Sequence, residues 1–424
     1  MESIIKTAMI KFLNMHNFIS SHQHGFLRGH STGFQILECL NQWTKAIDVG
    51  DCIDVCYIDF SRAFDTVSIP KLLLKLHGYG FKSELFNWLN AFFSDRKLCV
   101  KVNSVFSDCI TQTSGIAQGS CLGPLAFLLY INDLPQQLQF SNCSLFADDV
   151  KVYYCFKANE CTDPFQIDLN AIATWAKVWQ LTISVTKTIL LHIGNKNPKN
   201  SYIINGQKVT YKDCVRDLGV YVSSDLSWRS HCVEMCRKAN GVAHAILHMF
   251  KTNNINIYMK AFDAYVRPIV EYCSYVWNPS LKCDIDMVEN VQKSFTRRAF
   301  YKCDLNRTSY LGRLQFLKRS TLEYRRITMS LSIFYQIFHN FVSCNVLHNF
   351  NPPHVQLRGH SKQIFIPFCK TSVRKNFFTI RMLPLWNGLP SSVVDSNVTN
   401  AFLRRLDECD FTKFLRFNDD FLCL

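Results

Sequence analysis

The sequence lacks a long hydrophobic run. Its longest, LAFLLYI at residues 125–131, has seven residues, whereas a helix that spans a membrane needs about 20. It also shows no secretory signal, because Lys6 and Lys11 interrupt the N-terminal helical pattern and no apolar segment with a cleavage site follows. We therefore expect no membrane association.

The sequence also lacks a Cys-x-x-Cys pair, although it contains 19 cysteines. An odd number of scattered cysteines indicates an intracellular, reducing compartment with mostly buried thiols. Cys232, Cys236, His244 and His248 superficially resemble a zinc pattern. On one helix the first and last would lie roughly 24 Å apart, so we expect no zinc site unless the helix breaks at Gly241.

Negative charge is scarce in the second half of the chain. The formal net charge is +14. Residues 1–222 carry 20 Lys+Arg against 18 Asp+Glu, whereas residues 223–424 carry 27 against 15. This excess indicates a polyanionic partner, most simply nucleic acid, bound by the C-terminal half. A generally basic surface without such a partner is the alternative.

The length of 424 residues is enough for two or three domains. Helical patterns alternate with a few antiparallel strand patterns, which favours an α+β fold. The expected helices cover residues 1–20, 32–47, 68–80, 84–93, 119–131, 168–179 and 228–250. The expected strands cover residues 53–60, 98–102 paired with 109–113, 144–147 and 150–154 around an acidic turn, 189–193 and 215–222.

The most informative segment is the acidic pair Asp148-Asp149 between two strand-like runs. This pattern predicts a β-hairpin with two carboxylates at its tip, where they can jointly bind a hard cation. Asp59 ends another strand-like run. Three carboxylates on two neighbouring strands are what a two-Mg²⁺ site for nucleotidyl transfer requires. Taken alone, an Asp-Asp pair is more often a solvated turn.

Other motifs accompany the acidic pair in a fixed order. They are QHGFLRGHST (23–32), YIDFSRAFDTV (57–67), SGIAQGSCLGPL (114–125), YINDLP (130–135), FADDVKVYY (146–154), WQL (179–181) with Lys187-Thr188, and LGV (218–220) with LSW (226–228). Together these motifs closely resemble the reverse transcriptase of non-long-terminal-repeat retrotransposons, in the branch of jockey-like elements.

The resemblance implies a right-hand polymerase with a palm and partial fingers, followed by a mostly helical thumb and C-terminal region. It implies a fingers and palm domain at residues 1–222, a helical thumb and basic connector at 223–350, and a loop-rich and helical tail at 351–424, after a break at residues 351–353. The upstream part of the fingers and an endonuclease domain are expected to be missing, so the chain resembles a fragment of an element polyprotein.

The resemblance also implies catalytic roles for three carboxylates. Asp59, Asp148 and Asp149 are the expected ligands of two Mg²⁺ ions, with Mn²⁺ as an alternative. Such ions about 3.5–4 Å apart stabilise the attacking and leaving oxygens of an in-line phosphoryl transfer. Asp65 lies six residues after Asp59 and is expected to serve as a cap or turn residue.

Substrate-binding roles follow from the same resemblance. Phe64 is expected to be an aromatic gate that excludes the ribose 2′-hydroxyl, and a plain core Phe is the alternative. Gln118 and Gly119 are expected to line the nucleotide and template-base pocket, unless they form an ordinary strand-to-helix turn. Arg28 and Lys187 are expected to contact the triphosphate, or else to be solvated surface charges.

Two positions depart from the pattern of relatives. His30 stands where relatives tend to carry Arg or Lys, and Ser184 where they tend to carry Asn. A histidine is largely neutral at pH 7, which would weaken a phosphate contact. On the expected thumb helix, Arg229, Arg237 and Lys238 are the predicted contacts to a template–primer duplex.

The function implied is RNA-directed DNA polymerase, with an RNA template, a DNA primer and deoxynucleoside triphosphates as partners. A nuclear location follows only from the resemblance. Two alternatives remain open. One is a catalytically inactive remnant that binds nucleic acid. The other is an RNA-dependent RNA polymerase, against which the bulk of Phe64 argues because such an enzyme must accept the 2′-hydroxyl.

Overall fold

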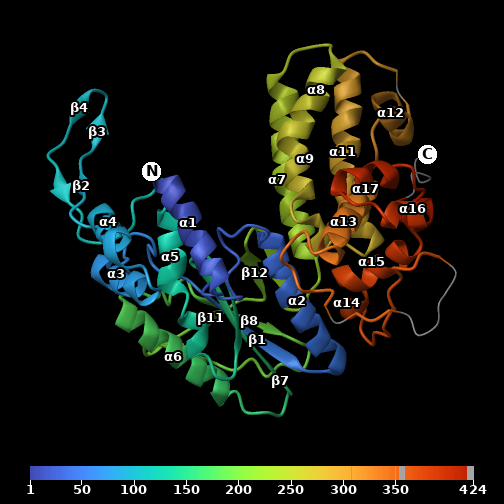
Figure 1. Ribbon diagram of the computed structural model, residues 1–424. Helices are drawn as coiled ribbons and strands as arrows, with labels where there is room; N and C mark the ends of the chain where they lie inside the picture. The colour runs from blue at the N-terminus through green and yellow to red at the C-terminus, as the bar shows by residue number, and fades with distance from the viewer. Residues whose placement is uncertain (307, 349, 353–358, 418–424) are drawn as a thin grey trace. The chain divides into compact units, whose positions relative to one another are not determined.

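The chain folds into two units in the computed structural model, which describes residues 1–306, 308–348, 350–352 and 359–417 (Figure 1). Unit 1 comprises residues 1–35 and 50–213, and unit 2 comprises residues 36–49 and the described residues from Cys214 onward. Helix α2 (Thr32–Val49) begins in unit 1, and its residues from Ile36 onward belong to unit 2.

Unit 1 combines one main sheet with helices and three short strand pairs. Its helices are α1 (Glu2–Met15), α3 (Ile69–Gly78), α4 (Ser83–Phe93), α5 (Gly123–Ile131), the 3₁₀ turn η1 (Leu134–Gln137) and α6 (Asp163–Trp179). Its strands are β1 (Cys52–Ile58), β2 (Lys97–Leu98), β3 (Lys101–Val102), β4 (Val105–Phe106), β5 (Ile110–Thr111), β6 (Asn142–Phe146), β7 (Asp149–Phe156), β8 (Ile189–Ile193), β9 (Ile203–Ile204), β10 (Gln207–Lys208) and β11 (Thr210–Tyr211). The short pairs are β2–β5, β3–β4 and β9–β10.

The main sheet has the strand order β11-β8-β1-β7-β6. β1 lies at its centre and pairs antiparallel with both β7 and β8. Side chains from β1, β6 and β7 form one hydrophobic core with α1, α3, α4, α5 and α6. The sheet and its helices therefore make a layered α+β unit, as the alternating sequence pattern predicts.

Local sequence explains where these elements begin. α3, α5 and α6 each carry a proline in their first turn, where the missing N–H costs no helical hydrogen bond. Every residue of α5 except Pro124 is buried, which explains why the longest apolar run of the sequence is a core helix. β1 places Asp54 in the interior, where His192 and Tyr202 hydrogen-bond its carboxylate.

Two predicted strands are wrong in detail. Residues 215–222 form a hairpin of two strands, β12 (Cys214–Asp217) and β13 (Val220–Ser223), because Leu218 and Gly219 both adopt positive φ and turn the chain. Residues 98–102 do not form one strand either. β2 pairs with β5, whereas β3 pairs with β4 across a turn at Asn103.

Unit 2 is mainly helical. Besides the β12–β13 hairpin it contains α7 (Arg229–Met249), α8 (Ile255–Ala261), the π-helical segment η2 (Phe262–Val266), α9 (Arg267–Glu271), α10 (Ser274–Trp277), α11 (Lys282–Lys302), α12 (Tyr310–Leu317), α13 (Leu322–Phe338), α14 (Ser372–Lys375), α15 (Phe378–Asn387), α16 (Ser391–Val394), α17 (Thr399–Leu406) and the 3₁₀ turn η3 (Thr412–Phe414).

Helix α7 runs through Gly241 without interruption. Its two cysteines, Cys232 and Cys236, are buried, whereas His244 and His248 are exposed. The break predicted at residues 351–353 lies partly outside the described residues, because Pro353 is not among them. The boundary expected near residue 222, between the fingers and palm domain and the thumb, stays a prediction. The two compact units divide after residue 213.

Candidate active site

Strand register brings Asp59 next to the acidic turn. β1 ends at Ile58, which pairs with Val150 of β7, so the next pair along the antiparallel register would be Asp59 with Asp149. Residues directly opposite in such a ladder have Cα atoms about 4.5–5.5 Å apart. Asp148 lies in the two-residue turn between β6 and β7. The predicted hairpin with an acidic tip is thus confirmed.

The carboxylates interact electrostatically. Partial burial raises the pKa of Asp148, and the nearby negative charge of Asp59 raises this pKa further. One carboxylate oxygen of Asp59, Oδ2, is buried without a hydrogen-bond partner. A bound cation would offset the negative charge of Asp148 and would give Oδ2 of Asp59 the partner that it lacks. Within the described ranges, no group of three or more His, Cys, Asp or Glu side chains is placed so that it could hold a metal ion, and this includes Asp59, Asp148 and Asp149.

This donor set nevertheless suits Mg²⁺. The ion keeps several waters and usually takes one or two protein carboxylates together with substrate phosphates. Asp59 and Asp148 supply oxygen ligands of this kind, and the exposed Asp149 follows Asp148 directly. The role of the three residues as metal ligands stays a prediction.

The acidic turn is held by Gln23, the first residue of the QHGFLRGHST motif, for which the sequence predicted no role. Ala147 adopts φ of 56°, an uncommon conformation for a residue with a side chain. The buried Gln23 carboxamide oxygen accepts hydrogen bonds from the N–H groups of Ala147 at 3.0 Å and Gly25 at 2.7 Å. The backbone of His24 also bonds to Leu145. This segment therefore fixes the position of the carboxylate-bearing turn.

A second turn supports Asp59 from the other side. The backbone N–H of Ser184 donates to the Asp59 carbonyl at 2.8 Å, and the Asp59 N–H donates to the Thr188 hydroxyl at 3.4 Å. Lys187 lies in this turn and is exposed. Ser184 and Thr188, which flank Lys187, both hydrogen-bond the backbone of Asp59. The fold thus brings Lys187 close to Asp59, although 128 positions separate them in the sequence.

Phe64 combines features of a core residue and of an accessible one. Its ring stacks on the buried Phe127 with centroids 4.2 Å apart and an interplanar angle of 19°. It also meets the exposed Phe26 edge-on at 6.4 Å. The side chain is only half-buried. The stack orients the ring, and part of the side chain remains accessible. The gate role stays a prediction.

The loop that carries Gln118 and Gly119 packs on the segment that follows Phe64. The Ile116 N–H donates to the Phe64 carbonyl at 2.9 Å, and the Gln118 amide donates to the Asp65 carboxylate at 3.0 Å. Gly115, with φ of 89°, lies so close to Asp65 that a Cβ atom there would overlap its backbone. Asp65 therefore ties two motifs together, which goes beyond its expected turn role.

The motif around Arg28 carries little positive charge besides Arg28 itself. Arg28 is exposed. Burial lowers the pKa of His30, and burial together with the neighbouring His30 lowers the pKa of His24 to about 3. Their Nδ1 atoms lie 3.2 Å apart. Both rings are thus neutral near pH 7, so Arg28 is the cation that this motif offers to a phosphate.

The three cations of α7 that are predicted to contact nucleic acid differ in whether a carboxylate of the protein pairs with them. Arg229 donates to the buried Asp284 carboxylate at 2.5 Å, and Arg237 donates to Glu234 at 2.9 Å. Lys238 is exposed. Two of the three predicted contacts are therefore already neutralised by carboxylates of unit 2.

An acidic hairpin turn beside a carboxylate at the end of the central strand, in an α+β unit, defines a polymerase fold. The family model described as reverse transcriptase (RNA-dependent DNA polymerase) matches residues 2–222. The chain belongs to this family, as its motifs predict.

Curated relatives come from retrotransposons. The chain is 24% identical over 310 residues to the probable RNA-directed DNA polymerase from transposon BS of Drosophila melanogaster. It is also 24% identical over 316 residues to the RNA-directed DNA polymerase from mobile element jockey of Drosophila funebris. Each alignment covers 70% of this chain and 34% of the relative. The matched region thus spans about a third of the length of these relatives.

Solved structures to which the chain is similar include two telomerases. The apo telomerase of Candida tropicalis matches 77% of this chain and 53% of its own, with 11% identity and a TM-score of 0.45. The telomerase of Candida albicans, solved with a fragment of telomeric RNA, covers 77% of this chain and 55% of its own, with 12% identity and a TM-score of 0.41.

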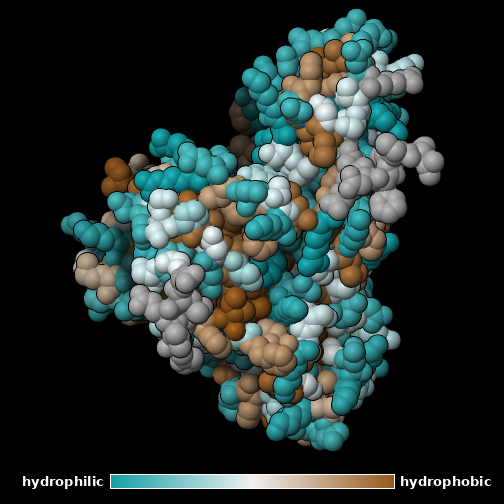
Figure 2. Space-filling model, turned by 90° about the vertical axis from the view of Figure 1, so that its right-hand side faces the viewer, coloured by the Kyte–Doolittle hydropathy of each residue, from teal (hydrophilic) through white to brown (hydrophobic). Residues whose placement is uncertain are grey.

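None of the helices in the described part of the chain is both long and apolar enough to cross a membrane. The face drawn in Figure 2 is dominated by hydrophilic side chains, with smaller hydrophobic patches between them.

Proposed function

We propose that this chain is an RNA-directed DNA polymerase that extends a DNA 3′-end on an RNA template with deoxynucleoside triphosphates. The observation that carries the proposal is the β1–β7 register, which sets Asp59 beside the Asp148-Asp149 turn in a chain of the reverse transcriptase family. The names of the relatives from transposon BS and jockey support the same reaction.

Asp59, Asp148 and Asp149 would hold Mg²⁺. Bound there, the metal would stabilise the charge that develops on the oxygens of the transferred phosphoryl group. The protein's own part is to orient these carboxylates. The Gln23 carboxamide holds the turn, and the Ser184–Thr188 segment holds the backbone of Asp59.

The remaining site residues bind the nucleotide in this proposal. Phe64 would lie under the sugar and exclude a 2′-hydroxyl. Gln118 and Gly119, oriented through Asp65, would line the base-pair pocket. Arg28 and Lys187 would contact the triphosphate, since both are exposed cations on segments that pack near the acidic turn or Asp59.

A primer-extension assay tests the proposal. The purified chain with Mg²⁺, deoxynucleotides and a DNA primer on an RNA template should extend the primer. Asp149→Asn should reduce the rate by about a thousandfold or more, because a neutral amide cannot replace a charged metal ligand. The matched control is Asp108→Asn, which changes another exposed aspartate of unit 1.

Other outcomes would favour the alternatives. A chain that binds primed template without extending it, with or without Mn²⁺, would be an inactive binding remnant. Extension with ribonucleotides in preference to deoxynucleotides would indicate an RNA polymerase. Equal rates for Asp149→Asn and the unchanged chain would contradict the carboxylate mechanism.

A further inference from the structure

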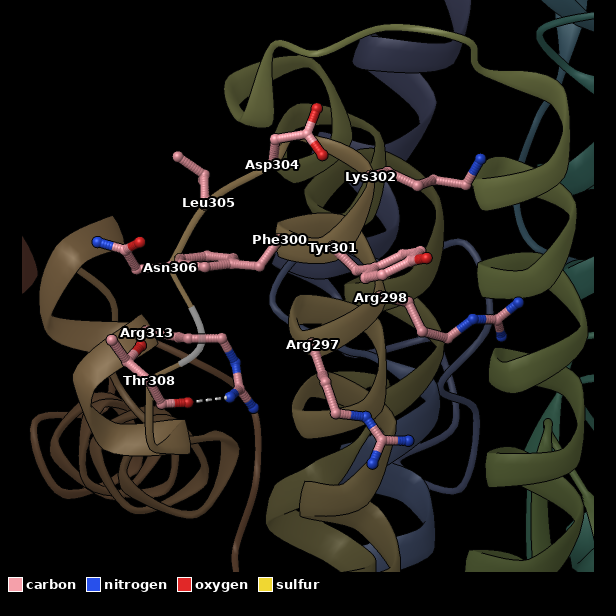
Figure 3. A pocket seen from close by; sticks show the side chains of 10 residues that line it. All are labelled: Arg297, Arg298, Phe300, Tyr301, Lys302, Asp304, Leu305, Asn306, Thr308 and Arg313. Carbon is pink, nitrogen blue, oxygen red and sulfur yellow. Dashed lines mark hydrogen bonds between the residues drawn. The ribbon is translucent and has the colours of Figure 1, made fainter.

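A cavity of about 750 Å³ lies at the C-terminal end of α11 in unit 2. We call it the α11 pocket. Its size is in the range typical of small-molecule sites. α11 and the loop after it provide most of the lining, and Arg313 of α12 completes it (Figure 3). The pocket shares no residue with the predicted contacts of α7 or with the carboxylate site of unit 1.

The α11 pocket is strongly cationic. Arg297, Arg298, Lys302 and Arg313 line it, against the single acidic residue Asp304. The three cations of α11 are exposed and form no ion pair with any carboxylate in the described ranges of the chain. This distinguishes them from Arg229 and Arg237, which are paired. Their charge is therefore available to an external anion.

Aromatic groups lie among these cations. Tyr301 is 73% exposed although its ring is large and rigid. On the helix it is the i+4 neighbour of Arg297 and the i+3 neighbour of Arg298, so all three share one surface. Phe300 is buried and packs edge-on against Phe316 at 5.6 Å. Figure 3 shows Tyr301, Arg298 and Lys302 projecting to one side of α11 and Phe300 to the other.

The position of Arg313 is fixed before any ligand binds. Its guanidinium donates to the Thr308 carbonyl at 2.7 Å, to the Lys293 carbonyl at 3.3 Å and to the Thr296 hydroxyl at 3.3 Å. Arg298 is oriented in a similar way by a contact of 3.3 Å with His244 of α7. The wall of the pocket is thus preorganised.

We propose that the α11 pocket binds a single-stranded nucleic acid, with one base stacked on Tyr301 and the flanking phosphates on Arg297, Arg298 and Lys302. Proteins that bind single strands combine a cationic groove with aromatic rings on which bases stack. An acidic protein segment would use the charges but would gain nothing from an exposed ring. The site goes beyond the proposed polymerase function and does not depend on its carboxylates.

The binding test uses the full chain and two fluorescein-labelled probes, a 12-nucleotide oligouridylate and the matching oligothymidylate, followed by anisotropy. Tyr301→Ala should weaken binding by about tenfold, the usual cost of losing one stacked base, whereas Tyr301→Phe should bind normally. Arg297→Gln should make the dependence of log affinity on log salt shallower by about 0.7.

Matched controls come from the same unit. Tyr265 is also exposed, at 64%, and Arg404 is exposed on α17. Tyr265→Ala and Arg404→Gln should leave binding unchanged. Asp149→Asn should also bind both probes normally, which separates this site from the polymerase reaction. Because Tyr301 is exposed, Tyr301→Ala should keep the circular dichroism spectrum of the unchanged chain.

A photochemical arm locates the contact. Irradiation of an oligouridylate that carries 5-iodouridine should attach the probe to the peptide that contains Tyr301. If Tyr301→Ala lowers the affinity for both probes, the site recognises bases and phosphates of either nucleic acid. If it lowers the affinity for the RNA probe alone, the site is assigned to RNA. Equal affinities of Tyr301→Ala and Tyr265→Ala, an adduct only at other peptides, or equal competition by a polyglutamate of the same charge would overturn the proposal.

Discussion

Phe64 shows how one side chain can serve packing and specificity together. Its stacking on Phe127 fixes the plane of the ring, while part of the side chain remains accessible. Among 34 phenylalanines, only its place in the motif around Asp59 distinguishes it. The neighbouring Asp65 accepts a hydrogen bond from Gln118. A substitution at Phe64 should therefore also shift the loop that carries Gln118.

We expect Phe64→Val to increase the incorporation of ribonucleotides relative to deoxynucleotides by about tenfold, since discrimination by steric fit is of this order. Single-nucleotide extension on a primed RNA template measures the ratio. The control is Phe93→Leu, which changes another buried phenylalanine of the unit 1 core and should lower stability without changing sugar selection. Unchanged discrimination in a folded Phe64→Val variant would assign Phe64 to the core alone.

At the scale of elements, the β6–β7 hairpin depends on a segment more than 100 residues away in sequence. Its turn contains Ala147 at positive φ, a conformation that costs of order 1–3 kcal/mol. The hydrogen bond from Ala147 to Gln23 and the close approach of Gly25 support that turn. A Cβ atom on Gly25 would overlap the backbone nitrogen of Ala147.

Gly25→Ala should therefore displace the acidic turn and lower kcat by about a hundredfold, because a shift of about 1 Å in a catalytic group can have an effect of this size. Gly241→Ala is the control, since a Cβ atom there meets nothing within 4 Å and alanine favours a helix. Steady-state primer extension gives kcat, and thermal unfolding shows whether the fold is kept. Full activity of Gly25→Ala would mean that the turn tolerates this displacement.

At the scale of the whole molecule, the excess of positive charge after residue 222 is not uniformly available. Part of it is neutralised inside unit 2, as in the pair of Arg229 with the buried Asp284. Lys238 and the three α11 cations of the α11 pocket, Arg297, Arg298 and Lys302, remain exposed. Net charge alone therefore overestimates how many side chains can contact phosphates.

This difference gives a prediction for duplex binding. Lys238→Gln should weaken binding to a primed template and make the salt slope shallower by about one unit, the value for one lost phosphate contact. Arg229→Gln should instead destabilise unit 2, because Asp284 would be left buried without its partner.

Salt titrations followed by anisotropy measure the slopes, with Lys413→Gln as an exposed control. A slope that Lys238→Gln leaves untouched would show that α7 does not contact the duplex.

The sequence by itself determined the family, the α+β class and the candidate carboxylates, because these depend on local patterns. An apolar run that ends in Asp59 and a hairpin that carries Asp148 and Asp149 can be recognised from neighbouring residues alone. Helix positions such as α4 and α7 follow from the same local periodicity.

Only the tertiary structure decided which side chains support or neutralise these groups. The contacts of Gln23 with Ala147, Asp65 with Gln118 and Arg229 with Asp284 join residues 53 to 124 positions apart. No local pattern encodes such pairs, because they arise when whole elements pack. The α11 pocket depends on packing in the same way, since hydrogen bonds from Arg313 of α12 to the preceding loop and to α11 hold this side chain in the pocket wall.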